Sequence, residues 1–162
     1  MARRDKINYY LDLAEVVSQR GTCLRRRYGA VIVKNDEVIS TGYVGAPRGR
    51  QNCSDIGVCI REKLQIPRGE RYELCRSVHA EMNAIISAPR DKMIGAAMFL
   101  TGINVKDGSY VSNGMCCSMC KRVVINSGIE TIYIRDDKDS YRVIKVSDWI
   151  ENDESVEGVR GY

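Results

Sequence analysis

Apolar residues recur at helical spacing near the start of the chain. Between residues 5 and 21 they lie three or four positions apart, as on one face of a helix, at Ile7, Tyr10, Leu11, Ala14 and Val17. Gly21 can end this helix in a left-handed conformation. The pattern therefore predicts a first helix within residues 5–21.

The pattern then changes to one typical of strands. Residues 30–34 and 38–43 are rich in β-branched and aromatic side chains, and Asn35 and Asp36 between them favour a tight turn. We expect a β-hairpin here. From residue 44 to 74 the periodicity is lost and Gly, Pro, Arg and two cysteines dominate, so we expect a long loop that has a function or is held by a metal.

The second half of the chain alternates between helical and strand patterns. We expect helices at 78–88 (stopped by Pro89), 117–127 (stopped by Gly128) and 147–152, strands at 95–102, 129–134 and 141–146, a polar loop at 103–114, and a loosely held tail from about residue 152. The order α-β-β-α-β-α-β-β-α predicts an α/β fold, a three-layer α/β/α sandwich with a mixed sheet of about five strands. One domain over residues 1–162 accounts for the whole length.

Composition narrows the class of protein. Of the 162 residues, 44% are hydrophobic and 28% charged, which is ordinary for a soluble globular domain. No apolar run is long enough to cross a bilayer, and the first residues do not resemble a signal peptide, so we expect a cytoplasmic protein without a membrane partner. A net charge of +4 allows an anionic ligand such as a nucleotide.

The cysteines suggest a metal site. Seven cysteines, an odd number, in a chain without a secretory signal favour metal ligands or catalytic thiols over disulfides. Cys117 and Cys120 lie three apart at a predicted helix start, where the helix dipole favours thiolates. The sole histidine, His79, also lies at a predicted helix start. Two sulfur ligands and one nitrogen ligand indicate zinc, with a fourth position open for water.

Glu81 lies two residues after His79. Residues two apart on a helix do not share a face, so the pair is badly placed as joint metal ligands. At the start of a helix that points into a pocket, however, this glutamate can reach the bound water and carry its proton. Glu81 is therefore the candidate catalytic residue.

Several separated motifs now resemble one family. The His79-Ala80-Glu81 and Cys117-x-x-Cys120 motifs, with the blocks YGAVIV, ISTGYVGAPRG, CRSVHAEMNAI and CKRVVINSGI, resemble the deoxycytidylate deaminase branch of the zinc-dependent cytidine and deoxycytidylate deaminases. The resemblance runs from about Cys23 to Ile134. It implies a cytidine deaminase-like fold and hydrolysis of dCMP to dUMP, a step of pyrimidine nucleotide metabolism that supplies dTMP. It also implies one catalytic zinc and a homo-oligomer such as a hexamer.

The chain departs from the family pattern at three places. Cys116 stands where the family usually has proline, and if it also bound zinc the site would be a closed structural one. Val44 replaces an asparagine associated with nucleotide binding, which bears on substrate contacts and on control by dCTP or dTTP effectors. The loop at 103–114 is longer than usual, and it either reshapes the pocket mouth or is a solvent-exposed addition.

The family pattern also suggests roles for other residues. Relatives often carry a second, structural zinc, for which the candidate ligands here are Cys23, Cys53, Cys59 and Cys75; the alternative is that these are reduced, buried thiols. Arginines near the predicted pocket could bind a 5′-phosphate. The candidate substrate contacts are Val44, Ala80, Asn83, Arg48, Arg90 and Tyr133.

Three alternatives remain open. The substrate could be another cytosine nucleotide or nucleoside, such as dCTP or deoxycytidine. It could be a tRNA adenosine, but the chain shows no evident basic face, so a nucleic-acid partner is not expected. Outside enzymes, the chain could be a zinc-stabilised interaction module, which would tolerate Glu81→Ala without functional loss.

Overall fold

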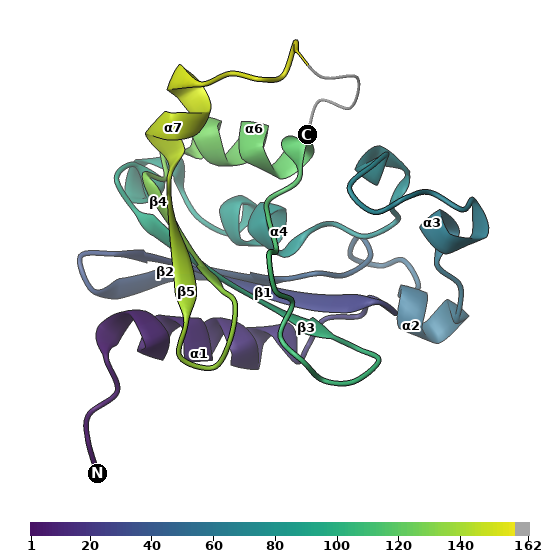
Figure 1. Cartoon of the computed structure of the whole chain (residues 1–162), viewed down its shortest axis with the longest axis horizontal. Helices are drawn as coiled ribbons and strands as arrows, with labels where there is room; N and C mark the ends of the chain where they lie inside the picture. The colour runs from purple at the N-terminus through teal and green to yellow at the C-terminus, as the bar shows by residue number, and fades with distance from the viewer. Residues whose placement is uncertain (158–162) are drawn as a thin grey trace.

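A five-stranded mixed sheet forms the centre of the molecule (Figure 1). The computed structural model describes residues 1–157, and the strand order is β2-β1-β3-β4-β5. Neighbouring strands are antiparallel except β3 and β4, which are parallel. The strands are β1 (Arg26–Lys34), β2 (Glu37–Tyr43), β3 (Ala97–Asn104), β4 (Thr131–Arg135) and β5 (Tyr141–Lys145). The predicted mixed sheet is thus confirmed.

The predicted hairpin forms between β1 and β2. Asn35 and Asp36 adopt φ values of 51° and 65°, the left-handed conformation that a two-residue turn with matching twist requires. Strand β1 begins at Arg26, four residues before its expected start, because its backbone pairs with β3 as far as Arg26 opposite Asn104. The apolar run marks only the buried part of this strand.

One helix covers one face of the sheet. Helix α1 (Lys6–Ser18) packs Leu11 and Ala14 against Val31 and Phe99. Gly21 does not end it in a left-handed conformation: the helix stops at Ser18, and Gly21 is not among the residues with positive φ. A Cβ on Gly21 would lie 2.9 Å from the Ser18 carbonyl oxygen, so this glycine instead allows a close backbone approach.

The opposite face is covered by α4 (Ala80–Ile86), α6 (Ser118–Ser127) and α7 (Val146–Glu151), as Figure 1 shows. The three layers match the predicted α/β/α sandwich. Alternation along β4 separates the two cores, because Ile132 and Ile134 face this side and Tyr133 faces α1. Gly128 ends α6 with φ 87°, as predicted, and the short helix α5 (Arg90–Met93) follows Pro89.

The segment between residues 44 and 74 is only partly a loop. It contains α2 (Cys53–Ile56), α3 (Ile60–Lys63) and the 3₁₀ helix η1 (Tyr72–Leu74). Buried Arg61 holds the segment together, since its Nη2 donates to the carbonyl oxygens of Pro67 (2.9 Å) and Glu70 (2.6 Å). These short helices depend on polar contacts, so hydrophobic periodicity did not reveal them.

The loop after β3 lies against the body of the protein. Val111 N–H donates to the Gly102 carbonyl (2.9 Å), and the Tyr110 hydroxyl contacts Glu15 of α1 (2.9 Å). The expected tail falls partly on residues 158–162, which lie outside the described residues. Within residues 1–157, no helix has both the length and the apolar character needed to cross a membrane.

Candidate active site

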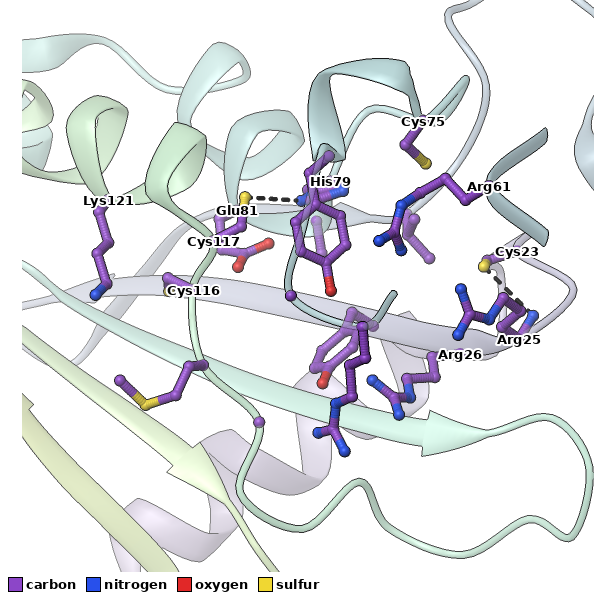
Figure 2. Close-up of a pocket in the computed structure, with 18 of the residues that line it drawn as sticks. Cys23, Arg25, Arg26, Arg61, Cys75, His79, Glu81, Cys116, Cys117 and Lys121 are labelled. Carbon is purple, nitrogen blue, oxygen red and sulfur yellow. Dashed lines mark hydrogen bonds between the residues drawn. The ribbon is translucent and has the colours of Figure 1, made fainter. Parts of the chain in front are cut away.

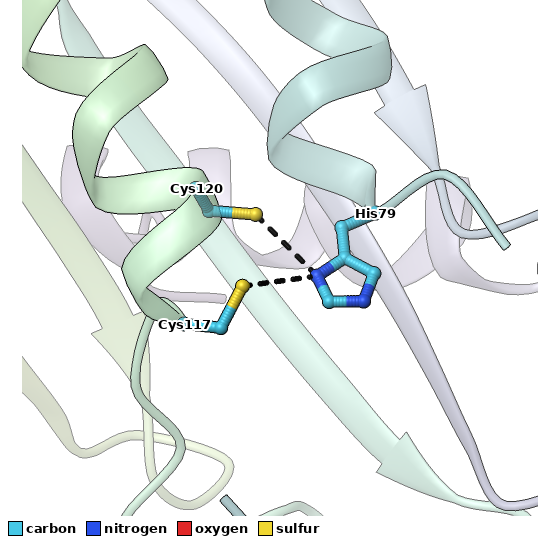
Figure 3. Close-up of side chains that lie close together, drawn as sticks. All are labelled: His79, Cys117 and Cys120. Carbon is cyan, nitrogen blue, oxygen red and sulfur yellow. Dashed lines mark hydrogen bonds between the residues drawn. The ribbon is translucent and has the colours of Figure 1, made fainter. Parts of the chain in front are cut away.

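The starts of α4 and α6 bring three candidate metal ligands together (Figure 3). His79 Nδ1 lies 3.5 Å from Cys117 Sγ and 3.4 Å from Cys120 Sγ. Nitrogen and sulfur ligands on one tetrahedral zinc lie about 3.5–3.6 Å apart, as follows from bond lengths of about 2.0–2.1 and 2.3 Å. The donor types and their separations therefore fit zinc.

The candidate ligands lie at the starts of two helices, α4 and α6. His79 and Cys117 are N-cap residues with extended backbones, and each begins a helix that packs against the other. Cys120 lies in the first turn of α6 and is fully buried. Because the spacing of three returns Cys120 to the side of Cys117, both sulfurs face the His79 ring.

Electrostatics at this cluster favour a bound cation. A hydrogen bond from Cys120 lowers the pKa of Cys117 to about 4, although burial opposes the shift, and His79 strengthens it. Burial would lower the pKa of His79, but hydrogen bonds with Cys117 and Cys75 and the nearby Glu81 charge raise it to about 11. A proton on His79 thus supplies positive charge beside the Cys117 thiolate. Metal binding releases such protons, so a metal ion could take this role.

Glu81 lies in the first turn of α4, with only 5% of its surface exposed. Burial raises the pKa of its carboxyl group, and this effect outweighs the opposing attraction of His79. A carboxyl group with a raised pKa can both accept and donate a proton during a reaction. Glu81 is therefore well suited to proton transfer next to the three candidate ligands.

Cys116 faces Glu81 and does not join the ligand cluster. It is 3% exposed, and burial, followed by the Glu81 charge and a hydrogen bond to Glu81, raises the pKa of its thiol. Among the described residues, the group of candidate ligands within 4.8 Å of one another consists of His79, Cys117 and Cys120. Residues 1–157 thus provide three candidate ligands at this point and not the four of a closed site.

A cavity of about 420 Å³ opens beside the cluster, and its walls differ in charge. Glu81, Cys116 and Lys121 lie toward one side, and several arginines lie toward the other (Figure 2). Of the described residues that line the cavity, Glu81 is the sole carboxylate. The cationic lining residues are Arg25, Arg26, Arg61, Arg68 and Lys121.

Two of the residues predicted to contact the substrate, Val44 and Ala80, line the cavity. Asn83 does not line it: its amide donates to the carbonyl oxygens of Tyr43 (2.8 Å) and Val78 (3.4 Å), which ties α4 to the chain around it. The prediction that Asn83 lies in the pocket is therefore wrong, and in the structure Asn83 holds α4 in place.

Three further predicted contacts also lie away from the cavity. Arg48 is exposed in a turn, and Arg90 donates from Nε to the Asn126 carbonyl (2.9 Å). Tyr133 stacks on Phe99 (4.8 Å between ring centroids) under α1, on the far face of the sheet. Because side chains alternate between the two faces along β4, Tyr133 packs in the core under α1 and not at the cavity.

Sequence reasoning missed several lining residues: Tyr28, Arg61, Arg68, Tyr72 and Lys121. Tyr28 could have been found from the sequence. Arg26, Tyr28 and buried Ala30 are two residues apart along β1, so their side chains lie on the same face of the sheet. For Arg61, Arg68 and Tyr72 no such pattern existed, since the path of an irregular segment does not follow from its sequence.

The four cysteines suggested for a second zinc are not gathered into a ligand cluster. Cys23, Cys59 and Cys75 line the cavity, whereas Cys53 is buried with its sulfur 3.8 Å from the Ser77 hydroxyl oxygen. None of them belongs to a group of three or more candidate ligands in residues 1–157. The geometry gives no support for a second metal site.

Comparison with known sequences agrees with this geometry. Residues 4–135 match the family described as the cytidine and deoxycytidylate deaminase zinc-binding region. The deoxycytidylate deaminase of Mycobacterium phage D29 is 34% identical over 137 residues, covering 82% of this chain and 95% of the relative. The deoxycytidylate deaminase of Schizosaccharomyces pombe is 37% identical over 86 residues, covering 53% of this chain but only 26% of that longer relative.

Solved structures share the fold. The dCMP deaminase of cyanophage S-TIM5 in apo form aligns with a TM-score of 0.56 at 24% identity, over 85% of this chain and 88% of the relative. Cytidine deaminase from Mycobacterium tuberculosis aligns with a TM-score of 0.51 at 16% identity, over 92% and 97%. These similarities place the α/β/α sandwich among deaminase folds.

Proposed function

Because this chain belongs to the cytidine and deoxycytidylate deaminase zinc-binding family, we propose that it hydrolyses dCMP to dUMP and ammonia. The observation that carries the proposal is the buried Glu81 carboxyl group beside His79, Cys117 and Cys120 at one end of a cavity. The S-TIM5 dCMP deaminase, whose fold is similar, has been solved with dCMP and dUMP.

The three candidate ligands would hold one zinc ion. When bound there, zinc supplies a water molecule acidic enough to act as a nucleophile near neutral pH. His79, Cys117 and Cys120 leave one side of the cluster facing the cavity, where the cytosine ring would lie. Val44 and Ala80, which are buried and line the cavity, would exclude other water and hold the base.

Glu81 would carry protons between water and base. It would accept the proton that the attacking water loses as oxygen bonds to C4 of cytosine, and donate a proton to N3 of the ring. It would then accept the remaining proton of the oxygen now bonded to C4 and pass it to the departing amino group, so that ammonia leaves and the C4 carbonyl of uracil forms. The raised pKa of Glu81 supports both directions of transfer.

Ultraviolet-monitored deamination tests this proposal. Zinc-loaded protein is offered dCMP, dCTP, deoxycytidine and CMP in parallel, and the product is identified as the corresponding uracil compound with release of ammonia. We expect dCMP to be deaminated with the highest kcat/KM. If one of the other three compounds is deaminated with a higher kcat/KM, that compound and not dCMP is the substrate. If folded, zinc-containing protein deaminates none of the four, the proposal of a cytosine deaminase is rejected.

The family resemblance leads to further expectations. Assembly into a homo-oligomer, control by dCTP or dTTP and a cytoplasmic location stay predictions. Val44, which replaces the family asparagine, lines the cavity, so it is placed where it could affect substrate contacts directly.

A further inference from the structure

Arg61 occupies an unusual position for an arginine. It lies in α3, within the segment that covers the cavity, and only 4% of its surface is exposed. Nevertheless it lines the cavity, and Figure 2 shows it on the same side as Arg25 and Arg26 and away from Lys121 and Cys116. A charged side chain is rarely buried to this extent without a specific reason.

The guanidinium group of Arg61 is held firmly in place. Its Nη2 donates to the carbonyl oxygens of Pro67 and Glu70, and its Cζ lies 4.1 Å from the centre of the Tyr72 ring. The carbonyl oxygens and the ring are neutral, so they orient the group without cancelling its charge. The Tyr72 ring in turn meets the edge of His79, with 5.5 Å between ring centroids.

One polar atom of this side chain has no partner. Arg61 Nε is buried and makes no hydrogen bond within the protein, which is costly for a charged donor. An anionic group of a ligand in the cavity would compensate the positive charge of this side chain. The neighbouring Arg25 forms an ion pair with Glu62 (3.3 Å). Its charge is therefore partly neutralised, whereas the neutral partners of Arg61 leave its charge available to a ligand.

We propose that Arg61 is the residue that recognises the 5′-phosphate of the nucleotide and so distinguishes dCMP from the uncharged nucleoside. This inference rests on the proposed function, which places the cytosine ring at Glu81. In a nucleotide the base and the 5′-phosphate are attached at different ends of the sugar, and Figure 2 shows Glu81 on one side of the cavity and Arg25, Arg26 and Arg61 on the other. The contacts of Tyr72 with Arg61 and with His79 fix the phosphate site relative to the candidate metal ligands.

Calorimetric binding of dUMP and deoxyuridine to Arg61→Met tests the proposal, alongside steady-state kinetics with dCMP. We expect dUMP to bind about 10- to 100-fold more weakly than to the parent protein, the range for loss of charge-assisted hydrogen bonds. Deoxyuridine binding should change little. For dCMP, KM should rise by the same factor while kcat is largely kept, because phosphate binding is the same in ground and transition states.

Two further variants make the result decisive. Arg122→Met removes an exposed arginine of α6 that does not line the cavity, and should leave all three measurements unchanged. Arg61→Lys keeps the charge but removes Nε, so it should weaken dUMP binding several-fold without affecting deoxyuridine. This second variant decides the question if Arg61→Met does not fold.

Two outcomes would overturn the inference. Unchanged dUMP binding would show that Arg61 does not contact the phosphate. An equal loss for dUMP and deoxyuridine would show a purely structural role. Binding of dUMP is measured without turnover. If the parent protein deaminates none of the substrates, the proposed function is rejected, but the binding comparison still tests the role of Arg61.

Discussion

Three cysteines within five positions have three different environments. Cys117 begins α6 and faces His79, Cys120 is buried one turn later, and Cys116 is buried against Glu81. Spacing alone predicted that Cys117 and Cys120 would share a side of the helix, and the family resemblance chose Cys117 over Cys116. Both expectations agree with the structure.

Substitution of the two adjacent cysteines, Cys116 and Cys117, should affect zinc binding differently. Cys117→Ser should weaken zinc binding by at least about 100-fold, since loss of an outer partner alone typically costs about 10- to 100-fold. Cys116→Ser should retain one zinc per chain with similar affinity. Competitive titration with a chromophoric chelator measures both values. Strong loss of zinc in Cys116→Ser would instead mean that Cys116 is a ligand.

At the residue scale, the sequence predicted the candidate metal ligands and Glu81 better than the residues that line the cavity. His79, Glu81, Cys117 and Cys120 were predicted because their chemistry depends on short, local spacings. Tyr133 was wrongly assigned to the pocket because the face on which a strand residue lies depends on register, which spacing does not give. Arg61 was not found because its position depends on contacts within an irregular segment.

At the element scale, the position of α4 depends on Gly42 of β2. A Cβ on Gly42 would lie 2.3 Å from Ala84 N and 2.4 Å from the Ala80 carbonyl oxygen, so no larger residue fits unless the helix moves. This close approach positions the helix that carries Glu81 and follows His79. The site therefore depends on a glycine that has no chemical role.

Gly42→Ala should lower the free energy of unfolding by about 1–3 kcal/mol, the usual cost of overpacking. Gly45→Ala is the matched control, because its Cβ would meet its nearest neighbour, Thr22 Oγ1, at 3.4 Å. Chemical denaturation of both variants gives the comparison. Equal stability of Gly42→Ala and the parent protein would show that α4 adjusts freely.

Elements with an apolar or β-rich pattern were predictable, and the four-residue helices were not. Helices α1 and α6 and the five strands all follow from apolar periodicity or from β-rich runs, although β1 extends beyond its apolar run. Helices α2, α3 and α5 each have only four residues, too few for a periodic pattern. Their stability comes from caps and tertiary contacts such as those of Arg61.

At the scale of the whole molecule, a buried arginine joins distant parts of the chain. Arg135 of β4 is fully buried and forms ion pairs with Asp12 (2.8 Å) and Glu15 (3.0 Å) of α1. The Tyr110 ring lies 5.7 Å from its guanidinium carbon, so the loop after β3 joins the same network. Sequence alone could not pair residues more than 100 positions apart.

Arg135→Met should destabilise the protein by about 2–3 kcal/mol at neutral pH. This is less than for a fully buried pair, because Asp12 and Glu15 remain partly exposed. Burial would raise the pKa of Asp12, but hydrogen bonds from Arg4 and Arg135 lower it overall. Such a carboxylate stabilises the fold above its unfolded pKa of about 3.9, and this contribution is lost as the pH falls through the lower folded value.

The stability difference between Arg135→Met and the parent protein should therefore shrink below about pH 4. Denaturation curves at pH 7 and at pH 3 measure it. A difference that stays constant or grows on acidification would show that the Asp12 ion pair does not contribute to stability.

The most direct test of the account combines zinc content and dCMP turnover in Glu81→Gln. Glutamine has nearly the same shape as glutamate but cannot carry the proton. We predict one zinc per chain, as in the parent protein, with turnover of dCMP lower by at least about 100-fold. Retained turnover, or turnover lost only together with the zinc, would contradict the role of Glu81 as the proton carrier of this site.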